Sequence, residues 1–209
     1  MKNVLLIGDS IRMGYDKAVK KTLEGKANVY FPDDNNRFAA YVLRYFHDYA
    51  NLISDGDIDV IHWNAGLWDC LRLFEEEPHT PKDVYEYYID RICARMQKLY
   101  PNAKVVFATS TPVMSEQMVA PFMRYNEEIR EYNQIAVRVA QKYGFLVNDL
   151  YAVAEQLDDT AHSDPVHFYT PAGTQAFANQ VLACIAPLLG IEETLTYKEE
   201  IYTDKPIGM

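Results

Sequence analysis

Five short apolar segments alternate with longer segments of helical character along most of this 209-residue chain. The apolar segments cover residues 4–8, 28–31, 59–63, 103–108 and 145–148. Helices are expected at 11–25, 38–52, 81–100, 125–143, 151–157 and 171–189. Strands that alternate with helices in this way predict a parallel sheet with helices on both faces. We therefore expect an α/β fold, a three-layer α/β/α sandwich around a five-stranded parallel sheet.

The sequence indicates one main domain. Pro171 stands where a proline is favoured in the first turn of the last helix, and the segment after Gly190 has no clear periodicity. No internal repeat or low-complexity linker interrupts residues 1–190. We expect a domain over 1–190 and a C-terminal extension over 191–209 that packs on the domain or trails from it.

The charge balance argues against several partners. The chain has 30 acidic and 20 basic side chains, which gives a formal net charge of −10. Nucleic acids and acidic membrane surfaces attract Lys and Arg, so neither is an expected partner. No apolar run approaches the roughly 18 residues of a membrane helix, and the run VLLIG near the N-terminus is shorter than the core of a signal peptide. We expect a cytoplasmic protein, and the sequence leaves its oligomeric state open.

Three cysteines, Cys70, Cys93 and Cys184, are widely spaced and form no CxxC pattern. A disulfide scaffold and a cysteine-based metal site are therefore not expected, and neither is a cofactor.

Polar residues gather directly after the expected strands and in the last loop. They occur at 9–10, 35–36, 64–69, 109–112 and 164–167. In open α/β sheets ligands bind at the carboxyl ends of the strands, so these loops are expected to share one edge. Ser10 stands between a buried strand and a helix, where its hydroxyl would face this edge. The alternative is that residues 8–10 only cap a helix, since Asp and Ser are common caps.

A serine hydroxyl needs a base, and histidine is the usual one near neutral pH. Of the five histidines, His47 and His62 are expected to be packed or surface side chains, and His79 has no evident role. His162 and His167 share the last polar loop, but only His167 follows an aspartate by three residues, in the sequence DPVH. A carboxylate there would orient the imidazole, so Asp164 and His167 are the favoured partners of Ser10.

This order of motifs resembles the SGNH/GDSL hydrolase superfamily over about residues 1–188. GDS ends the first strand, a glycine-containing block follows the third, Thr-Pro follows the fourth, and DxxH precedes the last helix. The resemblance implies a flavodoxin-like fold and hydrolysis of esters or thioesters without a metal. It also implies Ser10 as nucleophile, His167 as base and Asp164 as the orienting carboxylate.

The middle blocks depart from the usual pattern of that family. The second block, DDNNRF, lacks the glycine whose N–H helps to stabilise the oxyanion, so Asn36 or its neighbour is the expected substitute. The third block, residues 66–69 (GLWD), has Trp68 in place of the usual asparagine. Asn64 in the same loop could supply the amide, together with the N–H of Ser10. The run NAGLWD is more similar to the PC-esterase-type branch.

Asp9, Arg12 and Trp68 are predicted to bind substrate. Arg12 and Arg37 could bind an anionic group, but pairing with Asp16 or Asp34 is the alternative.

The leading hypothesis is a serine esterase that removes a small acyl group, such as acetyl on a carbohydrate. An altered domain that only binds an acylated or glycosylated partner is the alternative. A receiver-like or flavin-binding flavodoxin domain is a third possibility, but it leaves DPVH without a role.

Overall fold

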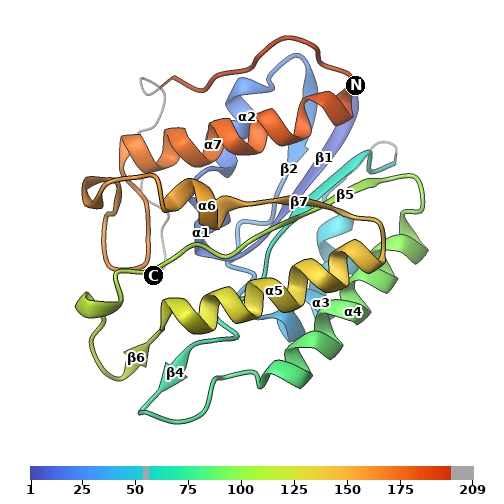
Figure 1. The fold of residues 1–209 in the computed structure, drawn as a ribbon. Helices are drawn as coiled ribbons and strands as arrows, with labels where there is room; N and C mark the ends of the chain where they lie inside the picture. Colours follow the sequence, from blue (N-terminus) through green and yellow to red (C-terminus); the bar gives the residue numbers. More distant parts are fainter. Residues whose placement is uncertain (54–56, 199–209) are drawn as a thin grey trace.

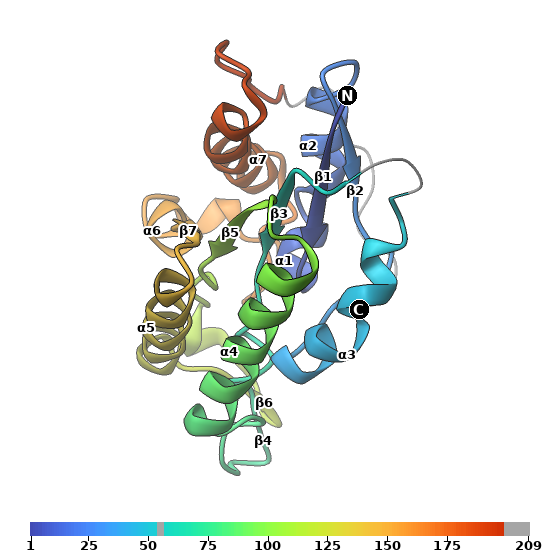
Figure 2. The same cartoon turned by 90° about the vertical axis from the view of Figure 1, so that its right-hand side faces the viewer.

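The computed structural model describes residues 1–53 and 57–198, and these form a three-layer α/β/α sandwich (Figures 1 and 2). The central sheet has five parallel strands in the order β2-β1-β3-β5-β7. Its strands are β1 (Lys2–Ile7), β2 (Ala27–Tyr30), β3 (Val60–Trp63), β5 (Lys104–Ala108) and β7 (Leu146–Asn148). The predicted fold class is confirmed.

Helices cover both faces of this sheet. On one side α2 (Asp16–Thr22) packs against α7 (Pro171–Ile185), and on the other α4 (Lys82–Leu99) lies between α3 (Ala39–Ala50) and α5 (Asn126–Lys142). Two short helices, α1 (Ser10–Met13) and α6 (Leu150–Ala154), follow strands β1 and β7. Three 3-10 turns complete the described helices: Ser115–Gln117, Asp159–Ala161 and Pro187–Leu189.

Several helix boundaries differ from the expectation, and α6 ends at Ala154 rather than at 157. The helix expected at 11–25 is interrupted after Met13, and Gly14 packs so closely on Tyr169 that a Cβ there would lie 2.8 Å from its ring. The last helix ends at Ile185 rather than 189. Pro187, which has no N–H to donate, begins the separate 3-10 turn.

A second, two-stranded antiparallel sheet was not predicted. It pairs β4 (Arg72–Leu73) with β6 (Phe122–Met123), and it lies beyond the ends of α4 and α5 (Figure 1). Strands of two residues carry too little periodicity to be recognised in a sequence. This β4–β6 ribbon nevertheless matters for the site, because Arg124 follows it directly.

The central strands are buried on both faces, as their apolar runs predict. Val4–Ile7 and Val60–Trp63 are fully buried, and the latter stretch includes His62. Burial lowers the pKa of His62 to about 4, and its Nε2 lies 3.0 Å from Asn148 Nδ2. His62 is therefore a packed core side chain, as expected, while His47 is exposed beside Asp48.

The start of the C-terminal extension packs on the domain. Tyr197 is buried, and its N–H donates to Asn179 Oδ1 at 2.7 Å. The division at residue 190 stays a prediction, and 199–209 lie outside the described residues.

Within the described ranges, no helix is both long and apolar enough to cross a membrane.

A buried carboxyl group links the loop after β3 to α3. Phe38, which precedes α3, has no side-chain acceptor, and the Ala39 N–H instead donates to both oxygens of Asp69, at 3.1 and 3.0 Å. Burial raises the pKa of Asp69 to about 7, although hydrogen bonds from Thr80 and from the Ala39 N–H oppose this rise.

This shift makes stability pH-dependent. Folded Asp69 keeps a proton that the unfolded chain releases above its ordinary pKa of 3.8, so stability falls as pH rises from about 4 to about 7. The loss is at most about 1.4 kcal/mol per pH unit. Asp69→Asn does not titrate, so the difference in unfolding free energy between wild type and this variant should shrink across that window. Urea denaturation at several pH values measures it, and a constant difference would contradict the assignment.

Candidate active site

Ser10 lies at the carboxyl end of β1, as the first residue of α1. Asp9 caps this helix, with its Oδ1 accepting the Ile11 N–H at 3.0 Å. Asp9 is thus the helix cap that the alternative expected. Because Asp9 and not Ser10 caps the helix, the Ser10 hydroxyl can bind another partner.

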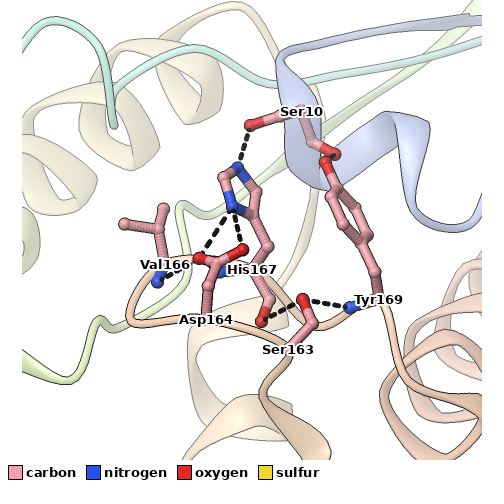
Figure 3. Close-up of polar contacts among 6 residues, drawn as sticks. All are labelled: Ser10, Ser163, Asp164, Val166, His167 and Tyr169. Carbon is pink, nitrogen blue, oxygen red and sulfur yellow. Dashed lines mark hydrogen bonds and ion pairs between the residues drawn. The ribbon is translucent and has the colours of Figure 1, made fainter. Parts of the chain in front are cut away.

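That partner is His167, 157 positions away in the sequence (Figure 3). Ser10 Oγ lies 2.8 Å from His167 Nε2, and His167 Nδ1 lies 2.9 Å from each oxygen of Asp164. The structure therefore brings Ser10, His167 and Asp164 into one hydrogen-bonded chain. Such a chain can move a proton from the hydroxyl to the imidazole while the carboxylate holds the ring in place.

The Asp164 loop folds around its own carboxylate. Oδ1 accepts the N–H groups of Val166 at 2.9 Å and of His167 at 3.0 Å, and this turn places the carboxylate beside the imidazole. Burial raises the pKa of Asp164, but the Val166 N–H and the adjacent His167 outweigh it, so the net pKa is lowered. Asp164 is therefore held in the ionised form that supports a positive imidazole.

Tyr169 ties the histidine loop to the serine backbone, and the sequence analysis missed it. Its ring stacks on His167 with centroids 4.8 Å apart, and its hydroxyl donates to Ser10 O at 2.6 Å (Figure 3). The available signal was an aromatic residue two positions after the expected base. His162, the other histidine of this loop, packs against Phe168 instead.

Asn64 lies where the loop after β3 meets the end of β1. A Cβ added to Gly8 would lie 1.9 Å from Asn64 Oδ1, so the amide packs directly on the glycine backbone. Burial raises the pKa of Asp9, and a hydrogen bond from the Asn64 side chain partly opposes the rise. Asn64 is thus placed beside the two residues that precede Ser10.

Asn36 has a different role from the predicted one. Its N–H donates to Gly8 O at 3.1 Å, and its Oδ1 accepts the Gly8 N–H at 2.9 Å. The neighbouring left-handed residue is Arg37, with φ of 44°, and its N–H is bound to Asn35 Oδ1 at 2.9 Å. The N–H groups of Asn36 and Arg37 are both occupied, so this geometry contradicts an oxyanion role for either of these two backbone donors.

Asp9 and Arg12 are both buried, which corrects their predicted contact with substrate. Asp9 is fully buried. Arg12 is 1% exposed, forms an ion pair with Asp16 and donates to Asp34 O at 2.6 Å. Arg12 therefore pairs with Asp16, as the alternative expected, but the pair lies in the interior. There the Arg12 side chain joins α1 and α2 to the loop after β2.

A cavity of about 470 Å³ opens beside the serine and histidine, a size typical of small-molecule sites. Trp68 lines it, and its predicted contact with substrate stays a prediction. The other lining residues come from five segments of the chain: Ser10, Asn35, Arg37, Leu67, Phe122, Arg124, Val166 and His167. Arg124 was not expected from the sequence, because no motif marks it.

The three cysteines are free thiols. Across residues 1–53 and 57–198, no group of three or more His, Cys, Asp or Glu side chains could hold a metal ion.

Comparison with known proteins places this geometry in a wider group. No family model matches the chain. A GDSL esterase/lipase of Arabidopsis thaliana, CPRD49, is 25% identical over 118 residues, or 52% of this chain and 46% of the relative. The chain therefore matches about half the length of that curated relative.

Solved structures match over nearly the whole chain. A GDSL-like lipase from Bacteroides thetaiotaomicron superposes with a TM-score of 0.69 at 16% identity, over 89% of this chain and 88% of the other. The acetylxylan esterase Axe2 from Geobacillus stearothermophilus gives 0.68 at 16% identity, over 91% and 95%. The chain has the fold of the GDSL-type hydrolases, which confirms the resemblance seen in the sequence.

The contact between Gly8 and Asn64 can be tested by Gly8→Ala. The added methyl would collide with Asn64 Oδ1, and such overpacking costs about 1–3 kcal/mol of unfolding free energy. Asn64→Ala removes this contact, although Arg12 Cβ would still lie 2.8 Å from the methyl, so the double variant should be destabilised by at least about 0.5 kcal/mol less than the sum of the single effects. Strict additivity in urea denaturation would show that the two residues are not in contact.

Proposed function

We propose that this chain is a serine esterase that hydrolyses an ester of a small acyl group through an acyl-enzyme. The observation that carries the proposal is the continuous hydrogen-bonded chain from Ser10 through His167 to Asp164 beside a cavity. Serine, imidazole and carboxylate in this order are the constellation that activates a hydroxyl for attack on a carbonyl.

Acylation would run as follows. Ser10 Oγ attacks the ester carbonyl carbon while His167 Nε2 takes the hydroxyl proton. The carbonyl oxygen becomes an oxyanion, for which the Ser10 N–H and the Asn64 amide are the proposed donors. Collapse breaks the bond to the alcohol oxygen, and His167 returns its proton to the leaving alcohol.

Deacylation repeats the sequence with water. His167 takes a proton from water as its oxygen attacks the acyl carbon. The bond to Ser10 Oγ then breaks, and the proton on His167 returns to the serine. Asp164 stays ionised throughout and stabilises the imidazolium.

The substrate class is proposed from the fold relatives and from the cavity. Several relatives are described as acetylxylan esterases, which supports an O-acetyl group on a carbohydrate-type alcohol. Trp68 lines the cavity and could pack against a sugar ring. The predicted cytoplasmic location stays a prediction.

Ser10 can be tested by labelling with a fluorophosphonate probe and by hydrolysis of 4-nitrophenyl acetate. Wild type should label and turn over, whereas Ser10→Ala should lose both activities. Ser115→Ala is the matched control, because Ser115 lies in a 3-10 turn and does not line the cavity. Labelling that persists in Ser10→Ala would reject Ser10 as the nucleophile. A folded wild type that neither labels nor hydrolyses any ester tried would reject the esterase and favour a binding domain.

Asn64→Ala tests the oxyanion role. Removal of one oxyanion donor typically lowers kcat by about 10²–10³-fold, so kcat should fall with little change in KM. Asn28→Ala is the control, since Asn28 bonds to Asn3 at the opposite edge of the sheet. A folded Asn64→Ala enzyme with wild-type kcat would assign the oxyanion to other groups.

A further inference from the structure

The cavity beside Ser10 is lined by two arginines and by no acidic side chain. Arg124 follows the β4–β6 ribbon, and Arg37 follows strand β2. The whole chain carries a net charge of −10, so a cavity with only positive charged side chains departs from its surroundings.

Arg124 is the unusual member of this pair. It is only 7% exposed, and its Nε donates to Leu67 O at 2.6 Å. No carboxylate of the described residues forms an ion pair with it. Buried charges are normally paired, because an unpaired charge loses hydration without compensation.

The two terminal nitrogens of Arg124, Nη1 and Nη2, take no part in the bond to Leu67. They have no hydrogen-bond partner in the part of the chain that the structure describes, and they are not fully enclosed by protein atoms. Since Arg124 lines the cavity, these donors are open to its contents. A guanidinium presents such donors as a planar fork that matches a carboxylate.

The carboxyl groups nearby do not neutralise Arg124. Asp9 influences it electrostatically, but Asp9 is fully buried and forms no ion pair with Arg124 in the described part of the chain. Asp164 is already engaged with His167. Arg37 is more exposed and lies 3.7 Å from Asp34 Oδ1, so its charge is partly balanced.

We propose that Arg124, assisted by Arg37, binds a carboxylate carried by the ester substrate. This assignment rests on the esterase function proposed above and narrows its substrate to an acylated compound with an acidic group. One cavity of about 470 Å³ holds both the serine and the guanidinium, so ester and carboxylate belong to the same small molecule or to one end of a larger one.

Matched pairs of esters test this assignment. 4-Acetoxybenzoate and its neutral analogue 4-acetoxybenzamide differ in charge on the alcohol side. The 4-nitrophenyl monoester of adipic acid and the corresponding terminal amide differ on the acyl side. Wild type should show a kcat/KM at least about tenfold higher for the carboxylate in one pair, since a hydrogen bond to a charged group is worth more than a neutral one. The pair that responds identifies the side that carries the charge.

Arg124→Gln should reduce that ratio to about one, because the carboxylate ester loses a charged partner that the neutral ester never had. Arg37→Gln should lower the ratio only partly. Arg72→Gln is the matched control, because Arg72 lies on the same ribbon, pairs with Glu128 and does not line the cavity. A wild-type ratio of one or less in both pairs, or a preference that survives in Arg124→Gln, would overturn the assignment.

A binding measurement separates this assignment from catalysis. Benzoate should raise the melting temperature of Ser10→Ala more than benzamide does at equal concentration, and Arg124→Gln should abolish the difference. If Arg124→Gln does not fold, Arg124→Lys, which keeps the charge but loses the fork, should weaken the benzoate effect. Equal shifts for benzoate and benzamide would reject the carboxylate site. If wild type shows neither fluorophosphonate labelling nor hydrolysis, but benzoate still raises the melting temperature more than benzamide does, only the esterase function is rejected and the carboxylate site stands.

Discussion

The backbone of Gly8 is the point around which the candidate site is assembled. Asn36 binds both its N–H and its carbonyl oxygen, and Asn64 packs where a side chain would otherwise be. The loops after β2 and β3 are thereby held against the end of β1, immediately before Ser10. Tyr169 adds the last loop through its bond to Ser10 O. Three segments far apart in the sequence thus converge on residues 8–10.

The polar groups around this point are buried or half-buried, and each is stabilised differently. Arg12 and Asp16 neutralise each other, Asp69 accepts backbone hydrogen bonds, and Asp164 is ionised beside His167. Leaving some groups of a buried polar network without hydrogen-bond partners is costly, so these side chains have few alternative arrangements. Arg124 is the member whose charge is left uncompensated, and it is also the one that reaches the cavity.

Much of this arrangement could be predicted from the sequence, for local reasons. Buried strands are recognisable in a sequence as apolar runs. DPVH is a short turn in which Asp164 and His167 are in contact within four residues, so this contact needs no tertiary packing. The roles of Arg12 and Asn36 could not be derived this way, because they depend on which residues contact each side chain in the folded chain. Arg12 lies in the same helix as Ser10 yet is buried in the interior, and the Asn36 N–H donates to Gly8 O. Tyr169 and Arg124 reach the site through tertiary packing, which leaves no periodic signal.

The position of Arg124 also changes what the net charge implies. A charge of −10 spread over the surface repels polyanions at long range, but salt screens this field within about 8 Å at physiological ionic strength. Inside a cavity with low-dielectric walls, a single uncompensated guanidinium dominates the local potential. A small monoanion therefore encounters weak repulsion outside and strong attraction within, whereas a polymer with many charges meets the repulsion along its whole length. The same chain can discriminate against acidic polymers and still select an acidic small molecule or the acidic end of a larger one.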